Sequence, residues 1–328
     1  MQLVDSRPPE VKALAINIKS AMSSLVVAHS SVQQARNTLC SLLHNDGNDA
    51  VGMLISAPPG MGKTNLCKAI VRSMNQGVTH TPEADKRPVL LIESPNSSVQ
   101  GGMAHLLLKA LGDLSPKKGN LEEKLDRIDN YIKRQEVQLI IIDEIHNYLP
   151  TRATSTPTQA VSFLKNLMNR TKVPVLFMGT HEAERLISFY DEMASRIRPR
   201  VVRFNNFSIS TPERLYEFAQ VLEAFAELLS QAGESFSFFK LEDGVQVLAQ
   251  ENLLKRIFVA TDGNLRNVRD LFYKMVDAVQ QGQKPTLEGF ANIWQPAMNE
   301  RLGFNPFIQA NDKKVAKHIL NINNVKGH

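Results

Sequence analysis

The segment at residues 53–64, MLISAPPGMGKT, constrains the fold of this chain more than any other. Its apolar start predicts a short buried strand, and residues 65–74 have the apolar spacing of a helix. A strand, a glycine-rich turn, Gly-Lys-Thr and a helix are the context of a phosphate-binding loop. We therefore predict a nucleoside triphosphate site at this turn. A turn that carries Gly-Lys-Thr by chance is the alternative.

The roles expected within this loop follow from phosphate chemistry. Small residues let backbone N–H groups turn inward around an anion, and the helix N-terminus adds partial positive charge. Lys63 would reach the β- and γ-phosphates, and the Thr64 hydroxyl would bind Mg²⁺. The residues expected to bind the nucleoside triphosphate are Pro59, Gly60, Met61, Gly62, Lys63, Thr64 and Asn65.

The composition is that of a globular protein with a real core. The chain has 328 residues, of which 43% are hydrophobic and 22% charged. A net charge of +5 permits a polyanionic partner without indicating one. Cys40 and Cys67 lack metal-binding spacing, which favours a reducing, cytoplasmic location. No apolar run reaches the roughly 18 residues that span a membrane, so no membrane partner is expected.

A second motif ends the longest apolar segment. Residues 137–142, VQLIII, predict a buried parallel strand, and Asp143-Glu144 follows it. Because nucleotides bind beyond the carboxyl ends of strands in open α/β sheets, Asp143 would bind Mg²⁺ and Glu144 would orient the attacking water. The alternatives are an acidic pair that merely ends a strand, and the DExH box of helicases, whose second motor domain does not fit the remaining length. We expect His146 to be a neighbour of the site.

Three further apolar segments, residues 88–93, 173–179 and 201–204, complete a predicted five-stranded sheet. Thr180 follows one of these strands and is the predicted contact for the γ-phosphate or the water, with His181 as the alternative. Residues 193–204 carry four arginines and no acid. We predict that Arg196 reaches the nucleotide of a neighbouring subunit as an arginine finger. A solvated basic loop is the alternative.

From residue 211 onward the spacing changes to that of helices. Helices are expected at residues 212–229, 241–261, 264–281 and 286–299, and only residues 236–239 suggest a strand. Gly263-Asn264-Leu265-Arg266 begins one helix, where Arg266 could lie over a nucleotide or the segment could simply cap the helix. The expected domains are an N-terminal arm (1–20), an α/β nucleotide-binding domain (21–207), an α-helical lid (208–300) and a basic tail (301–328), disordered or docking.

Together these motifs resemble those of AAA+ ATPases, over about residues 20–300. The chain is most similar to the TniB/TnsC group, the ATP-dependent target-selection regulators of DNA transposons. The stretches that carry this resemblance are IIDEIH at 141–146, VPVLFMGTHEA at 173–183 and ASR at 194–196. The fold implied is a P-loop α/β core with a five-stranded parallel sheet, followed by a small α-helical lid.

The resemblance also implies a function. Members of the group bind ATP with Mg²⁺ between subunits, hydrolyse it, and assemble as rings or helical filaments on double-stranded DNA without sequence specificity. They recruit a transposase, and some receive the target from a complex with a TniQ-type adaptor. By motif match, Arg196 takes the arginine-finger role and Arg266 a second sensor role at the nucleotide. DNA contacts are expected near residues 94–102 and 117–118.

Three other functions stay open at this point. Replication initiators or helicase loaders share parts of these motifs, although they usually carry a DNA-binding module after the lid. Secretion-linked ATPases share them too, although they would bring a membrane segment. A nucleotide-dependent scaffold that barely hydrolyses ATP would keep the phosphate loop without needing Glu144 as a catalytic group.

Overall fold

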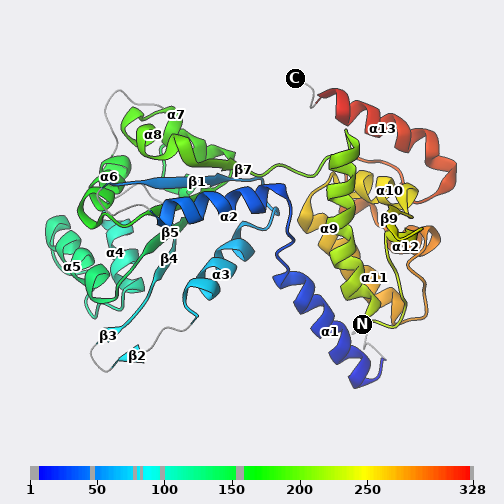
Figure 1. Cartoon of the computed structure of the whole chain (residues 1–328), viewed down its shortest axis with the longest axis horizontal. Coiled ribbons are helices and arrows are strands. Elements are labelled where there is room, and N and C mark those ends of the chain that lie inside the picture. Colours follow the sequence, from blue (N-terminus) through cyan, green and yellow to red (C-terminus); the bar gives the residue numbers. More distant parts are fainter. Residues whose placement is uncertain are drawn as a thin grey trace. The chain divides into compact units, whose positions relative to one another are not determined.

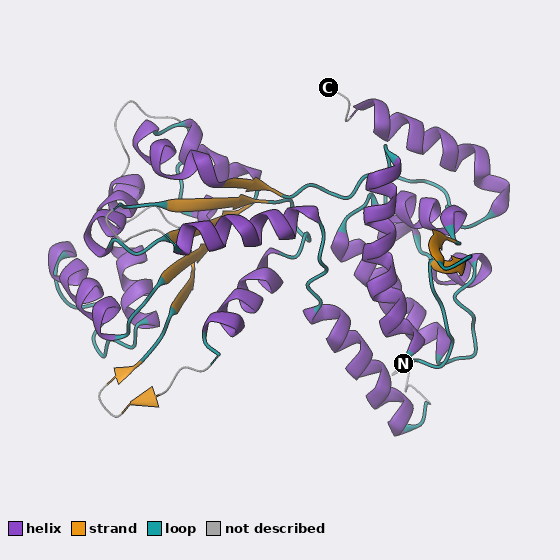
Figure 2. Cartoon of the chain, in the orientation of Figure 1, coloured by secondary structure: helices purple, strands orange, loops and turns teal. Residues whose placement is uncertain are grey.

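The computed structural model of the chain describes residues 7–44, 49–76, 80–81, 84–96, 100–152 and 159–325. It divides into two compact units. We call Ser30–Pro59 with Lys63–Asn205 the core unit, and Met1–His29 with Gly60–Gly62 and Asn206–His328 the helical unit. Figure 2 shows the large sheet of the core unit flanked by helices, whereas the described part of the helical unit contains only a short strand pair.

Five parallel strands form the sheet of the core unit, in the order β4-β5-β6-β1-β7 (Figure 1). They are β1 (Gly52–Ser56), β4 (Val89–Glu93), β5 (Leu139–Asp143), β6 (Val175–Gly179) and β7 (Val201–Arg203). Phe177 of β6 is paired with Leu54 on one side and with Ile142 on the other. Because the strands are parallel, their carboxyl ends lie along one edge, which we call the carboxyl edge.

Helices cover both faces of this sheet, because successive strand residues point to opposite sides. On one face, Leu54, Ile140 and Phe177 share a buried core with the helices that follow β4, β5 and β6. On the other, the Cys67 thiol donates to the Met178 sulfur at 3.0 Å. The helices of the core unit are α2 (Ser30–Leu43), α3 (Lys63–Met74), α4 (Gln100–Ala110), α5 (Leu121–Arg134), α6 (Gln159–Thr171), α7 (Arg185–Ser188) and α8 (Asp191–Ile197).

The predicted five-stranded parallel sheet is confirmed, and so is the helix predicted after the phosphate loop. Helix α5 shows how local sequence sets the ends of a helix. Asn120 accepts a hydrogen bond from the Glu123 N–H at 3.0 Å, and Glu123 accepts one from the Asn120 N–H at 3.0 Å. This capping box satisfies two backbone donors that the helix itself leaves unpaired. Leu125, Ile128 and Ile132 then bury one face of α5 against the core.

The helical unit has an aromatic core. Its elements are α1 (Pro9–Ser24), α9 (Pro212–Ser230), β8 (Phe239–Glu242), β9 (Val245–Leu248), α10 (Glu251–Thr261), α11 (Leu265–Val279), α12 (Leu287–Ile293) and α13 (Asp312–Val325). Phe290 of α12 stacks on Phe307 with ring centroids 5.4 Å apart and meets Phe272 of α11 edge-on at 6.0 Å. Such pairs add specific geometry to the burial of large apolar rings. None of the described helices is long and apolar enough to cross a membrane.

The expected arm at residues 1–20 differs from the structure, because residues 9–24 form helix α1. Pro9 lies at the start of this helix, where its fixed φ favours helix formation and its missing N–H costs nothing. Arg7 and Lys19 both pair with Asp277 of α11, at 3.0 Å and 2.6 Å. The segment therefore packs as part of the helical unit, and residues 1–6 lie outside the described chain.

The single helix predicted at residues 241–261 is wrong in its first half. Strands β8 and β9 form a hairpin there, with Glu242 opposite Val245, and α10 starts only at Glu251. Asp243 and Gly244 form the turn with φ values of 51° and 79°. Two positive φ values define the hairpin turn that Asp-Gly favours, so this dipeptide overrode the helical spacing around it.

Two further helix boundaries differ. The helix predicted at residues 286–299 is α12 and ends at Ile293, since Pro296 disfavours a helical conformation at the residue before it. The predicted basic tail contains helix α13, which was expected to be a disordered or docking segment. Residues 97–99 of the expected DNA-contact loop and residues 326–328 of the predicted tail lie outside the described residues.

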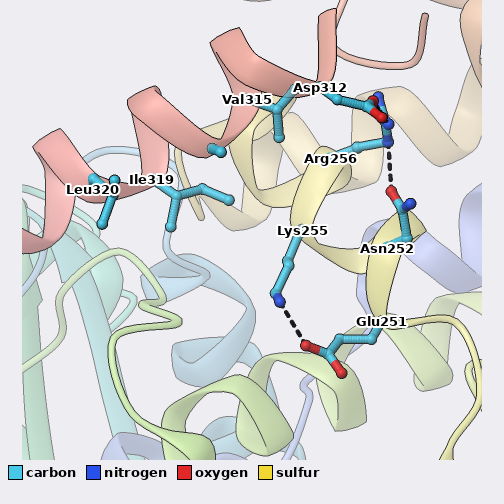
Figure 3. Close-up of a pocket in the computed structure, with 9 residues that line it drawn as sticks. Glu251, Asn252, Lys255, Arg256, Asp312, Val315, Ile319 and Leu320 are labelled. Carbon is cyan, nitrogen blue, oxygen red and sulfur yellow. Dashed lines mark hydrogen bonds and ion pairs between the residues drawn. The ribbon is translucent and has the colours of Figure 1, made fainter. Parts of the chain in front are cut away.

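Arg256 anchors α13 to α10. Its side chain is buried, donates to the Pro306 carbonyl at 2.5 Å and to Asn252 at 2.6 Å, and pairs with Asp312 at the start of α13 (Figure 3). A groove of about 710 Å³ runs between the two helices. A buried guanidinium needs all of these acceptors, so it fixes where the last helix begins.

Candidate nucleotide site

The loop between β1 and α3 has the backbone that its motif predicts. Gly60 and Gly62 have φ values of 85° and 82°, in the left-handed region that favours glycine. Helix α3 begins at Lys63, directly after the second glycine. The first N–H groups of a helix have no acceptor within it, so they are available to a phosphate at this point.

The Lys63 side chain reaches back over the loop. It is only 7% exposed, and its ammonium donates to the carbonyls of Ala57 at 3.0 Å and Pro58 at 3.3 Å. Its charge also acts on the carboxylate of Asp143 at the end of β5. The predicted phosphate lysine and the predicted metal ligand are therefore electrostatically coupled.

Asp143 is a buried carboxylate. Burial raises the pKa of its carboxyl group, and the Glu144 N–H, which donates to Asp143 Oδ1 at 2.8 Å, opposes that rise. A divalent cation here would offset the cost of burying the charge. Thr64, in the first turn of α3, brings a second oxygen. One carboxylate and one hydroxyl suit Mg²⁺, which takes its other oxygen ligands from phosphates and water.

Glu144 has a strained backbone that Ser94 holds in place. Its φ of 52° and ψ of 36° lie in the left-handed region. Ser94, which follows β4, donates from its hydroxyl to the Glu144 carbonyl at 2.5 Å and from its N–H to the Asp143 carbonyl at 2.9 Å. Ser94 was not predicted as part of this site. The signal that could have found it is a polar residue directly after a strand of the sheet, as at Thr180.

Thr180 follows β6 at the same edge. Its N–H points to His146 Nδ1 at 3.4 Å. Its hydroxyl is buried and has no hydrogen-bond partner among the described residues, which is costly unless a ligand supplies one. The side chain of His181 is 49% exposed, with Glu184 as its nearest carboxylate at 3.9 Å. The geometry therefore favours Thr180 over His181 as the candidate phosphate contact.

A cluster of three polar residues closes this edge next to the loop. Glu184 accepts hydrogen bonds from Ser56 at 2.7 Å and from two nitrogens of Arg203 at 2.9 Å and 2.8 Å. The Arg203 hydrogen bond lowers the pKa of the Glu184 carboxyl group. Ser56 ends β1 and Arg203 ends β7, so Glu184 ties two strand ends together. Neither Ser56 nor Glu184 was predicted.

Arg196 lies at the opposite edge of the sheet. It lines a polar pocket of about 360 Å³ whose other residues are Asp49, Ala50, Val51, Asn169, Lys172, Ser195 and Arg200. Val51 precedes β1 and Lys172 precedes β6, so this is the amino edge. Five-residue strands separate the two edges by roughly 16 Å. Arg196 therefore lies far from the phosphate loop of its own chain.

Within this pocket Arg196 is held by one hydrogen bond. Its Nη1 donates to Asn169 Oδ1 at 3.1 Å, and its Nε is buried with no hydrogen-bond partner in the part of the chain that the structure describes. Lys172 and Arg200 bring two more positive charges to the same pocket. Asp49 brings one negative charge to the same pocket, so the pocket has a net positive charge.

Arg266 belongs to the helical unit, where it lies in the first turn of α11 with an exposed side chain. Asn264 caps this helix by accepting from the Arg266 N–H at 3.1 Å, so the capping role weighed for this segment is present. Gly60, which is grouped with the helical unit, accepts from the same N–H at 3.0 Å. This contact involves only the backbone of Arg266, and its proposed role at the nucleotide stays a prediction.

Comparisons with known proteins agree with this picture. A protein-family model described as "TniB: Bacterial TniB protein" matches residues 17–206. The curated proteins show no significant match. Among solved structures, Cdc6p from Pyrobaculum aerophilum is similar, with a TM-score of 0.54 and 15% identity over 92% of this chain and 72% of that chain. The ORC2 protein of Aeropyrum pernix has a TM-score of 0.51 and 16% identity, over 92% of this chain and 71% of that one.

At this low identity the solved structures establish the fold alone, and that fold is the one of AAA+ ATPases. The five-stranded parallel sheet with a helical region after it agrees with their architecture. The family model covers more than half of the chain and includes the phosphate loop, the acidic pair, Thr180 and Arg196. The chain therefore belongs to the TniB family and has the AAA+ ATPase fold.

Proposed function

We propose that this protein binds ATP with Mg²⁺ at the carboxyl edge of its sheet and hydrolyses it to ADP and phosphate. The observation that carries this proposal is the convergence of four side chains at one edge. Lys63 follows β1, Asp143 ends β5 and Glu144 comes directly after it, and Thr180 follows β6. Their residue types match the needs of phosphoryl transfer, which depends on positioning and charge stabilisation.

Each residue has a distinct task in the proposed reaction. The ammonium of Lys63 exchanges its two carbonyl acceptors for the β- and γ-phosphate oxygens. Thr64 and Asp143 would hold Mg²⁺, which supplies charge neutralisation to the phosphate oxygens. The Glu144 carboxylate orients the attacking water and accepts a proton from it. The Thr180 hydroxyl donates to a γ-phosphate oxygen and so gains a hydrogen-bond partner.

Two substitutions separate binding from hydrolysis. Glu144→Gln keeps the shape of the side chain but removes its basicity, so turnover should fall by about 100-fold or more while ATP still binds. Lys63→Ala should abolish binding, whereas Lys68→Ala, at an exposed lysine on the same helix, should leave both intact. Fluorescent-nucleotide titration and phosphate release measure the two properties. Unchanged turnover in Glu144→Gln would instead favour the scaffold that barely hydrolyses ATP.

We further propose that ATP-bound subunits assemble on double-stranded DNA and recruit a transposase, with a TniQ-type adaptor as the targeting partner. Membership of the TniB family supports this proposal. So does the position of Arg196 at the amino edge, where it could complete the nucleotide site of the next subunit. The sequence of the DNA would matter little, because phosphate contacts dominate such binding.

One exposed loop is suited to contact DNA phosphates. Lys117 and Lys118 are exposed between α4 and α5. Arg127 shapes this loop, because it pairs with Asp113 at 2.9 Å and donates to the Lys118 carbonyl at 2.5 Å. The two lysines are thus presented on a defined backbone, which reduces the entropy lost on binding.

Salt dependence tests the DNA proposal. ATP, but not ADP, should give rings or filaments on random duplex DNA by electron microscopy. The slope of log affinity against log salt is negative, and its magnitude should decrease by about 2 in Lys117→Ala/Lys118→Ala. The reason is that about 0.9 counterion is released for each phosphate contact. Lys240→Ala/Lys284→Ala serves as the matched control. Equal affinity with either nucleotide would overturn the proposal, and a preference for one DNA sequence would favour an initiator.

A further inference from the structure

We propose that His146 is a positioning residue, which holds the carboxylate of Glu144 and connects it to the strand end at Thr180. His146 was expected to be only a neighbour of the site. The inference rests on the proposed ATP hydrolysis and adds a residue that acts through Glu144. It concerns the core unit alone.

The contacts of one ring nitrogen carry the inference. His146 lies in the 3₁₀ turn η1 (Ile145–Asn147), two residues after Glu144. Its Nδ1 is 3.3 Å from Glu144 Oε2 and 3.4 Å from the Thr180 nitrogen. The His146 side chain is 16% exposed and that of Glu144 is 32% exposed, so the contact is partly shielded from water. The same atom thus meets the proposed base and the proposed phosphate sensor.

The surrounding residues keep the imidazole in this place. Gly179, the last residue of β6, makes room for it, because a Cβ there would lie 3.0 Å from His146 Nδ1. Arg185 donates to the His146 carbonyl at 3.2 Å and to the Pro150 carbonyl at 3.0 Å, which fixes the turn that carries the ring. The ring therefore has little freedom to leave Glu144.

One nitrogen cannot serve both neighbours at the same time. When Nδ1 carries the ring proton, it donates to the Glu144 carboxylate and holds it. When Nδ1 gives its proton to solvent and Nε2 takes one from solvent, Nδ1 accepts from the Thr180 N–H and the Glu144 carboxylate is released. A γ-phosphate bound at Thr180 would alter the hydrogen bond between the Thr180 N–H and His146 Nδ1. The tautomer of His146 would then determine whether Nδ1 still holds the Glu144 carboxylate. This arrangement couples the presence of the third phosphate to the orientation of the base.

Two substitutions of His146 test this role. His146→Ala removes the contact and should lower kcat about tenfold or more, since a loosely held base is misplaced in the transition state. His146→Asn places an amide nitrogen near the position of Nδ1 and should keep kcat within about threefold of the wild type. ATP affinity and KM should stay within about twofold in both. The control is His44→Ala, at an exposed histidine at the end of α2.

A double-mutant cycle asks whether His146 acts through Glu144. In a Glu144→Gln background, His146→Ala should change single-turnover hydrolysis by less than about twofold, because the base it positions is already gone. The inference is overturned if His146→Ala keeps wild-type kcat, if the asparagine variant does not rescue, or if the alanine effect persists at full size in the Glu144→Gln background. A wild-type protein without ATP turnover would overturn the proposed hydrolysis itself, which is a distinct result.

Discussion

Cys67 shows how tightly single residues pack around the phosphate loop. Its side chain is 1% exposed in α3, four residues after Lys63. Burial, together with the negative charge of Asp143, raises the pKa of its thiol to about 12. Cys40 is exposed on α2. The two cysteines therefore differ in both access and ionisation, although neither forms a disulfide.

This difference predicts selective alkylation. At pH 8, a thiol with a pKa of about 12 is ionised in roughly one molecule in 10,000, and only the thiolate reacts. Iodoacetamide should therefore modify Cys40 within minutes and leave Cys67 intact in the folded protein, as read by mass spectrometry of peptides. Cys40→Ser should remove the fast reaction, and unfolding should expose Cys67. Equal rates at both positions would contradict the packing of α3.

At the residue scale, contiguous motifs made part of the candidate site predictable. Lys63, Asp143 and Thr180 stand next to predicted strands, so their place at the carboxyl edge followed from the topology of parallel sheets. Ser56 and Glu184 could not be found in this way, because they are 128 positions apart in the sequence and meet only after β1 and β6 pair. Such contacts depend on side-chain packing, which no local pattern records.

At the scale of elements, the carboxylate of Glu184 connects the ends of strands β1 and β7. Glu184 joins Ser56 and Arg203, and the hydrogen bonds from Arg203 lower the pKa of the Glu184 carboxyl group. A lowered pKa means that the folded state favours the ionised carboxylate. The stabilisation is therefore fully present above the ordinary pKa of a glutamate and is lost as the pH falls through the lowered value. Arg203 is half exposed, so solvent screens part of the interaction.

We expect Glu184→Gln to lower the melting temperature at pH 7, by the equivalent of about 1 kcal/mol or less. The difference from the wild type should shrink as the pH falls below about 4.5, the ordinary pKa of a glutamate, and should disappear once the wild-type carboxylate is protonated as well. Thermal unfolding followed by circular dichroism between pH 3 and pH 7 measures this. Glu227→Gln, at an exposed residue of α9, should show no such pH dependence. A constant difference across the range would mean that the ion pair is not its cause.

Element boundaries were harder to predict than the elements of the sheet. Leu241, Val245 and Leu248 have helical spacing, yet they lie in a hairpin because the turn between them has the backbone that Asp-Gly adopts. Residues 1–20 were expected to form an arm, yet Pro9 starts helix α1. In both places the conformational preference of one or two residues outweighed the structure predicted from the longer segment around them.

For the whole molecule, the central fact is that the candidate groups lie at two edges of one sheet. The phosphate loop and acidic pair are at the carboxyl edge, and Arg196 is at the amino edge. Under the proposed assembly, the site of one subunit is completed by the opposite edge of the next. Such a head-to-tail contact generates a ring if the rotation closes and a filament if it does not.

Mixing two inactive variants tests this arrangement. The Arg196→Ala variant keeps a complete phosphate loop and Glu144, and the Glu144→Gln variant keeps Arg196. A mixture of the two therefore contains some interfaces at which Glu144 of one subunit meets Arg196 of the next. We expect each variant alone to be nearly inactive and an equimolar mixture to recover roughly a quarter of wild-type turnover, because an arginine finger contributes on the order of 1,000-fold or more. A mixture of Lys63→Ala with Glu144→Gln should recover nothing. No recovery in the first mixture would place Arg196 outside its neighbour's site.

The two unlike edges of the sheet also give such an assembly a direction. At one end the last subunit keeps an arginine that no site uses, and at the other end a subunit keeps a site that no arginine completes. The phosphate backbone of duplex DNA looks the same in both directions, whereas a row of these subunits has two different ends. A partner that binds only one end of the assembly would therefore act on only one side of the marked DNA. The direction of the assembly follows from the two different sheet edges of a single chain.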